Sequence, residues 1–109
     1  MNVLFICSRN QWRSPTAESV WRKYPGLTVR SAGTSSKAKR KVTVGDLKWA
    51  DIVFVMEPKH RRRLQAEFRQ LLNHKRIEVL NIPDDYRYMD PELVTIFEAE
   101  AEQFLAETS

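Results

Sequence analysis

The only cysteine of the chain stands at the end of an apolar run, and an arginine follows it six positions later. Residues 3–6 are apolar and lead into Cys7, and the segment continues to Arg13, Ser14 and Pro15. A lone cysteine is usually a small buried hydrophobe. A thiol between a buried strand and a helix start lies in a different setting, because loop N–H groups and the helix dipole stabilise a thiolate. This spacing predicts that Cys7 is a nucleophile.

The residues after Cys7 are suited to binding an oxyanion. The N–H groups of a short loop and of a first helical turn point toward a common centre, where they bind phosphate. Arg13 adds a two-pronged contact with the anion, Ser14 is placed to donate to the thiolate, and Asn10 tolerates left-handed backbone geometry. A thiolate beside a bound phosphoryl group attacks phosphorus and forms a phosphocysteine. We therefore expect a phosphate-binding loop made of Ser8, Arg9, Asn10, Gln11, Trp12, Arg13 and Ser14.

The elements that position this loop alternate along the chain. Apolar runs and their boundaries predict strands at residues 3–7, 28–31, 51–56 and 77–80, and helices at 15–24 and 44–49, from 58 and from 91. Ser14 and Asp90 are expected to cap two of these helices, each before a proline. The alternation predicts an α/β fold, with residues 1–109 forming one domain, a three-layer sandwich with helices on both faces of a four-stranded parallel sheet. Such sheets bind ligands at the carboxyl ends of their strands, where Cys7 lies.

The charge of the chain is unevenly distributed. Lysine and arginine total 18 against 14 aspartate and glutamate residues, and the excess is concentrated at residues 37–41 and 59–63, whereas 90–107 is acidic. One face is therefore able to attract anions. The simpler interpretation is a solvated surface with pairs such as Arg63 with Glu67. The alternative is that Arg61, Arg62 and Arg63 meet an extended anionic substrate or partner.

Composition also bears on location and on bound groups. No apolar stretch is long enough to cross a bilayer, and the N-terminus lacks the pattern of a signal peptide. One cysteine allows no internal disulfide, which fits a reducing compartment. A cytoplasmic protein without membrane association is expected. His60 and His74 lack metal-ligand spacing, so we expect no metal and no cofactor, and interpret both as ordinary surface or packing residues.

The loop resembles that of the low-molecular-weight protein tyrosine phosphatases, which reads V-C-x-x-N-x-C-R-S-P-x-A-E. The chain matches this pattern at Cys7, Asn10, Arg13, Ser14, Pro15, Ala17 and Glu18. Residues 31–34 are similar to the family's S-A-G-T, and residues 51–57 to its D-x-I-x-x-M-D strand. The resemblance implies a phosphatase that acts through a phosphocysteine, without cofactor, on a phosphorylated substrate, with phosphotyrosyl protein as the substrate class.

The resemblance also implies a general acid. The family carries it in D-P-[YF] ahead of the last helix, and placing Asp84 on that position puts Asp85 at the proline and Tyr86 at the aromatic residue. Asp84 is the expected acid and later base, and Asp85 is the alternative. Tyr86 and Arg9 are expected at the rim of the substrate pocket.

The chain departs from the family pattern in four places. It is shorter between residues 34 and 42, where the family has a variable loop, so the pocket is expected to be shallow or open. Trp12 replaces a second loop cysteine, which removes a protective disulfide. Arg9 replaces a loop glycine, and Asp85 replaces the proline that stiffens the acid's loop.

Three other functions remain open. An open pocket suits a phosphatase acting on a nucleotide or an RNA phosphoester. An arsenate reductase would need an external thiol, because the chain has no resolving cysteine. The third possible function is a non-catalytic binding module. It would bind a phosphorylated ligand, or bind nucleic acid through the basic clusters. Nucleic acid is not favoured, because Cys7, Arg13 and a candidate acid are all present.

Overall fold

The computed structural model describes residues 1–108, and its elements follow the predicted alternation of strands and helices. In chain order they are β1 (Asn2–Cys7), α1 (Arg13–Trp21), β2 (Thr28–Gly33), α2 (Val44–Trp49), β3 (Ile52–Val55), α3 (Pro58–Glu67), the 3-10 helix η1 (Arg69–Leu72), β4 (Arg76–Val79) and α4 (Pro91–Thr108).

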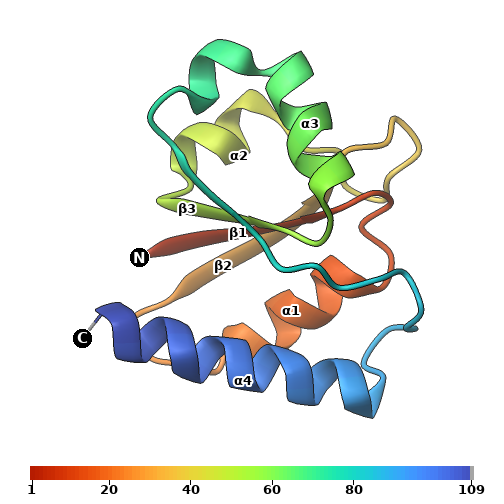
Figure 1. Cartoon of the computed structure of the whole chain (residues 1–109), viewed down its shortest axis with the longest axis vertical. Coiled ribbons are helices and arrows are strands. Elements are labelled where there is room, and N and C mark those ends of the chain that lie inside the picture. The colour runs from red at the N-terminus through yellow and green to blue at the C-terminus, as the bar shows by residue number, and fades with distance from the viewer. Residues whose placement is uncertain (109) are drawn as a thin grey trace.

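The four strands form one parallel sheet in the order β2-β1-β3-β4. Helices α1 and α4 cover one face of the sheet, and α2 and α3 cover the other (Figure 1). The predicted three-layer α/β architecture is therefore confirmed. Cys7 pairs with Gly33 at the end of β2, and Ile6 pairs with Val55 at the end of β3. The carboxyl ends of the strands thus meet at one edge, on the right in Figure 1.

Strand β1 is apolar along its length because both of its faces are buried. Phe5 and Cys7 lie in the cluster with α1 and α4, whereas Leu4 and Ile6 lie in the cluster with α2 and α3. A parallel strand covered on both sides has no solvent face for polar residues. The same alternation points the Cys7 side chain toward α1 and α4.

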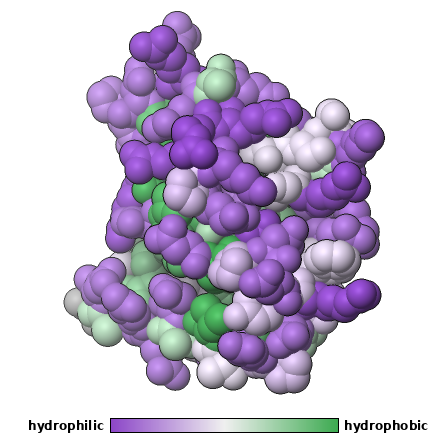
Figure 2. Space-filling model, turned by 45° about the vertical axis from the view of Figure 1, so that its right-hand side comes forward, coloured by the Kyte–Doolittle hydropathy of each residue, from purple (hydrophilic) through white to green (hydrophobic). Residues whose placement is uncertain are grey.

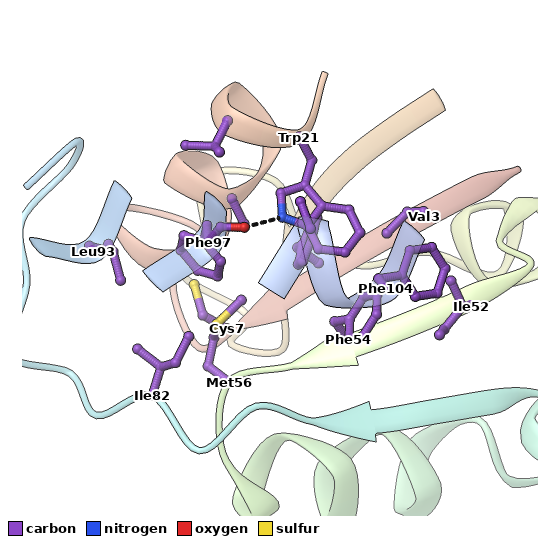
Figure 3. Packing of buried hydrophobic residues seen from close by; sticks show 14 residues of the cluster. Val3, Cys7, Trp21, Ile52, Phe54, Met56, Ile82, Leu93, Phe97 and Phe104 are labelled. Carbon is purple, nitrogen blue, oxygen red and sulfur yellow. Dashed lines mark hydrogen bonds between the residues drawn. The ribbon is translucent and has the colours of Figure 1, made fainter. Parts of the chain in front are cut away.

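Aromatic rings fill the layer between the sheet and the α1–α4 pair. The ring centroid of Phe5 lies 4.9 Å from that of Trp21 and 5.9 Å from that of Phe97. The indole N–H of Trp21 donates to the carbonyl oxygen of Phe97 at 2.9 Å, which joins α1 to α4 (Figure 3). Cys7 lies at one end of this cluster beside Met56 (Figure 3). Cys7, the predicted nucleophile, is therefore carried by a strand set in a tightly packed layer.

Helix α1 begins earlier than predicted, and Ser14 is not its cap. The helix starts at Arg13, its N-cap is Trp12, and no side chain caps it. The Ser14 hydroxyl instead lies 3.0 Å from the sulfur of Cys7. The prediction for Asp90 is confirmed, since its Oδ1 accepts from the N–H of Glu92 at 2.9 Å. The uncapped start of α1 leaves first-turn N–H groups for another partner.

The outer surface is mainly hydrophilic. The face turned forward in Figure 2 shows mostly hydrophilic residues, with hydrophobic ones scattered among them. The large hydrophobic residues that are exposed are Met1, Val44, Tyr88 and Met89. Within residues 1–108, no helix combines the length and the apolar character that crossing a membrane requires.

Candidate active site

The structure brings Cys7, Arg13 and Asp84 to one cavity at the carboxyl edge of the sheet. The cavity has a volume of about 430 Å³ and is lined by Cys7, Ser8, Arg9, Gln11, Trp12, Arg13, Lys59 and Asp84. Cys7 is 3% exposed and ends β1, Arg13 opens α1, and Asp84 lies in the segment between β4 and α4. Residues distant in the sequence thus meet where the parallel topology predicts a ligand.

A chain of hydrogen bonds directs a proton donor at the Cys7 sulfur. The Asn10 side-chain amide donates to the hydroxyls of Ser14 and Ser31, each at 2.9 Å. Ser31 in turn donates to a carboxylate oxygen of Glu18 at 2.5 Å. Because the Ser14 oxygen accepts from Asn10, its own proton is left for the Cys7 sulfur, 3.0 Å away, or for the more distant carbonyl oxygen of Ala32 at 3.4 Å. Asn10 has a φ of 54°, which confirms the predicted left-handed geometry.

Arg13 is buried and fixed at the floor of the cavity. One terminal nitrogen, Nη1, donates to Glu57 Oε2 at 2.6 Å and to the Ile82 carbonyl at 2.7 Å. Its Nε lies 3.6 Å from Asp84 Oδ1, which is too long for a hydrogen bond. Burial alone would raise the pKa of Glu57, but the hydrogen bond and charge of Arg13 outweigh it and lower that pKa. The guanidinium is thereby held with Nη2 free of hydrogen bonds to residues 1–108.

Glu57 was not assigned a role from the sequence. It lies two residues after the end of β3, at the edge of the sheet where Cys7 ends β1. The sequence did offer a signal for this residue, because an acidic side chain just after a buried central strand lies at the edge of the sheet where ligands bind. Such a side chain is placed to pair with a cation at that edge, as Glu57 does with Arg13.

His60 also contacts the loop that follows Cys7, and the sequence analysis missed this contact. It is 1% exposed, its Nδ1 accepts from the N–H of Glu57 at 3.0 Å, and its Nε2 lies 2.9 Å from Ser8 Oγ. Burial and the positive charge of Arg13 lower the pKa of His60 from 6.5 to about 4. The neutral ring therefore carries its proton on Nε2 and donates it to Ser8. The Ser8 hydroxyl proton remains available to a ligand.

The two candidate acids lie in different surroundings. Asp84 lines the cavity with Cys7, although its side chain is 58% exposed. Asp85 is exposed and does not line the cavity. Tyr86 packs against the apolar cluster, and its hydroxyl donates to Glu92 at 3.4 Å. Of the two predicted rim residues, Arg9 lines the cavity and Tyr86 does not.

The short segment between β2 and α2 is hydrogen-bonded to the backbone of residues 7–9. The N–H of Thr34 donates to the Cys7 carbonyl at 3.0 Å, and that of Lys39 donates to the Arg9 carbonyl at 3.0 Å. Gly33 permits this approach, since a Cβ there would lie 2.5 Å from the carbonyl oxygen of Ser8. The segment thus braces the loop from the side.

The arginine cluster lies beside the site and not in it. Arg61, Arg62 and Arg63 are exposed and form no ion pair within the described residues 1–108. The expected pair of Arg63 with Glu67 is wrong, because Glu67 pairs with Lys41 at 2.7 Å. Lys41, from the segment between β2 and α2, takes the place that was expected for Arg63 beside the Glu67 carboxylate.

Comparisons with known proteins find similarity at the level of structure. No protein-family model matches the sequence, and no curated protein matches it. SP-PTP, a low molecular weight protein tyrosine phosphatase from Streptococcus pyogenes, superposes with a TM-score of 0.80 at 19% identity, covering 99% of this chain and 93% of that one. Two other solved structures are similar over comparable spans.

The tyrosine phosphatase Wzb from Escherichia coli K30, solved with phosphate, superposes with a TM-score of 0.79 at 20% identity, covering 99% of this chain and 98% of that one. The YwlE arginine phosphatase from Geobacillus stearothermophilus has a TM-score of 0.73 at 21% identity, covering 97% and 94% of the two chains. The chain therefore has the fold of the low-molecular-weight protein tyrosine phosphatases.

Proposed function

We propose that this protein is a metal-independent phosphomonoesterase that acts through a phosphocysteine on Cys7. The observation that carries the proposal is the Cys7 sulfur, 3.0 Å from the Ser14 hydroxyl in a cavity that Arg13 and Asp84 also line. The uncapped first turn of α1 supplies N–H groups to a phosphoryl group bound there. Nucleophile, anion receptor and carboxyl group are thus within one cavity.

The first step transfers the phosphoryl group to sulfur. The thiolate attacks phosphorus, the bond from phosphorus to the leaving oxygen breaks, and Asp84 in its carboxylic-acid form donates a proton to that oxygen. The N–H groups of the loop and Arg13 stabilise the charge on the phosphoryl oxygens in the transition state. Ser14 donates to the thiolate and keeps it ionised.

The second step releases phosphate. Asp84, now a carboxylate, accepts a proton from water as the water attacks phosphorus and the bond to sulfur breaks. The thiolate of Cys7 leaves and again accepts the proton of Ser14. No redox partner enters this cycle, and each proton that Asp84 gives is recovered.

Phosphotyrosyl protein is the proposed substrate. Its support is the resemblance of the loop to the tyrosine phosphatases and the two tyrosine phosphatases among the similar structures. The arginine phosphatase among them makes phosphoarginine the second candidate. Arg9, Trp12 and Lys59 also line the cavity, and an aromatic ring together with two cations suits an aromatic phosphoester flanked by acidic residues. We also infer a single-domain protein of the cytoplasm, a compartment in which its lone thiol stays reduced.

Hydrolysis of p-nitrophenyl phosphate with EDTA present tests the reaction. We expect turnover by the wild type that EDTA does not reduce, loss of turnover in Cys7→Ser, and a phosphocysteine trapped by rapid acid quench. Correctly folded, reduced wild-type protein without turnover would contradict the proposal. Phosphotyrosyl peptides, phosphoarginine and nucleoside monophosphates, compared by kcat/KM, then rank the substrates.

A further inference from the structure

A second cavity lies against the catalytic loop. Its volume is about 600 Å³, within the range of small-molecule sites. It is lined by Asn10, Gln11, Trp12, Pro15, Glu18, Arg30, Ser31, Lys39, Arg40 and Tyr88. Only Gln11 and Trp12 also line the cavity of Cys7. The two hollows therefore have a common wall, and the second contains neither the nucleophile nor the candidate acid.

The second cavity carries an excess of positive charge. Arg30 and Arg40 both pair with one buried carboxylate, that of Asp46. Lys39 is exposed and has no ion-pair partner within residues 1–108. The carboxylate of Glu18 is engaged by Ser31 and Arg22. The carboxylates of Asp46 and Glu18 therefore do not neutralise all the cations at this cavity, and an anion entering it meets a net positive charge.

Three further lining residues are apolar or aromatic, Trp12, Pro15 and Tyr88. The Tyr88 ring is held by a hydrogen bond of 2.9 Å between its hydroxyl and that of Ser19. Aromatic side chains pack well against a planar ligand ring. The cavity therefore combines a surface for a ring with cations for an attached anionic group.

We propose that this cavity binds a planar aromatic anion and that its occupancy changes the activity of Cys7. Nucleotides and aromatic carboxylates share this chemistry. Asn10 and Ser31 line the cavity and belong to the hydrogen-bond chain that sets the Ser14 hydroxyl against the Cys7 sulfur. A ligand contacting them changes the orientation of Asn10, and through it the donor that stabilises the thiolate. The effect on activity rests on the proposed function, whereas the binding does not.

Calorimetric titration of the full chain with cyclic adenosine monophosphate tests the binding. This probe is a phosphodiester, so a phosphomonoesterase does not consume it. Indole-3-carboxylate is the second probe, and it distinguishes aromatic carboxylates from nucleotides. Adenosine and inorganic sulfate, titrated with the Cys7 loop already occupied by orthovanadate, test the ring and the anion alone. Each is expected to bind at least about fivefold more weakly than an aromatic anion.

Two lysine variants locate the bound probe. Lys39→Glu is expected to weaken binding by about fivefold or more, since it reverses a charge that lines the cavity. Lys37→Glu is the matched control, because Lys37 is an exposed lysine of the same segment that does not line the cavity. Orthovanadate bound at Cys7 is expected to change the affinity by no more than about twofold, because the sites are coupled but do not overlap. Competition with vanadate, equal weakening by both lysine variants, or no binding of either aromatic anion would overturn the site.

Steady-state assays with p-nitrophenyl phosphate test the effect on Cys7. A saturating probe is expected to change kcat by about twofold or more in the wild type and in Lys37→Glu, and to do so at higher concentration in Lys39→Glu. An unchanged kcat at full occupancy would overturn the coupling to Cys7. Binding without any phosphatase turnover would instead contradict the proposed function, and the lysine comparison would still stand.

Discussion

The chain of hydrogen bonds that reaches the sulfur of Cys7 comes from residues on three segments, the loop 8–12, helix α1 and strand β2. Cys7, Arg13 and the loop were predictable from the sequence, because they are contiguous and their spacing carries the chemistry. Glu57 and His60 were not, because their roles depend on contacts with Arg13 and Ser8, which lie more than 40 positions away. Sequence patterns locate contiguous motifs better than the partners that hold them.

Replacement of Asp84 tests its role at the scale of one carboxyl group. Asp84→Asn is expected to lower kcat for a phosphotyrosyl peptide by about 10²–10⁴-fold, because no acid then protonates the leaving oxygen. The loss should be smaller for p-nitrophenyl phosphate, whose leaving group needs less protonation. Asp85→Asn is the control and is expected to change kcat by less than about twofold. Equal losses in both variants would reject the assignment of Asp84 alone.

The buried His60 predicts how stability depends on pH. Its pKa is about 4 in the folded chain and near 6.5 when exposed. As pH falls from 6.5 to 4, the unfolded chain takes up a proton that the folded chain does not. The contribution of His60 to the free energy of unfolding is therefore expected to fall across this window by up to about 3 kcal/mol and to level off below it.

Urea unfolding at several pH values measures this dependence. His60→Gln should flatten the slope between pH 4 and 6.5, because glutamine does not titrate. His74→Gln is the matched control, since His74 is exposed, and should retain the slope. A slope that persists in His60→Gln would assign it to other groups.

Elements were predicted well where periodicity and burial agree. All four strands were predicted, β1 and β3 most clearly because each of these two is a short apolar run. Helix α2 was predicted with the bounds that it has. The start of α1 was predicted wrongly, because Ser14 followed by Pro15 has the pattern of a cap. The structure uses Ser14 for Cys7 and leaves the helix uncapped. The preference of serine for the N-cap position is therefore overridden by the contact of Ser14 with Cys7.

The contact between the segment 34–41 and the catalytic loop depends on Gly33. A Cβ at this position would lie 2.5 Å from the Ser8 carbonyl oxygen and 2.6 Å from the Ala38 Cβ. Gly33→Ala is expected to cost about 1–3 kcal/mol of stability and to displace the loop, lowering kcat/KM by about 100-fold. Thermal unfolding and p-nitrophenyl phosphate kinetics measure the two effects.

Gly45 provides the matched control for Gly33. It lies inside α2, and the nearest atom to a Cβ there is 3.7 Å away. Gly45→Ala is expected to stabilise the chain by up to about 1 kcal/mol, because alanine is the better helix former, and to leave activity unchanged. Similar kinetic losses in both variants would show that the effect of Gly33 is not local.

On the scale of the whole molecule, the fold is shared with structures that are 19–21% identical. In this chain the fold rests on the alternation of elements, the burial of β1 on both faces and the meeting of strand ends at one edge. These are properties of patterns, so they persist through extensive substitution. The second cavity could not be predicted, because its lining comes from α1, β2 and three loops whose packing no local pattern specifies.

Strand β1 is an inner strand of the sheet, hydrogen-bonded on one side to β2 and on the other to β3. Its amides are therefore released to solvent only when most of the sheet opens, whereas β4 is an edge strand and is able to open by itself. Native-state hydrogen exchange followed by NMR should find residues 3–6 exchanging with the global free energy of unfolding and residues 76–79 exchanging sooner. Equal protection of the two strands would contradict this ranking. If residues 3–6 are the better protected, partial opening of the chain exposes its edge strand β4. Cys7 then stays attached to β1, the strand that opens last.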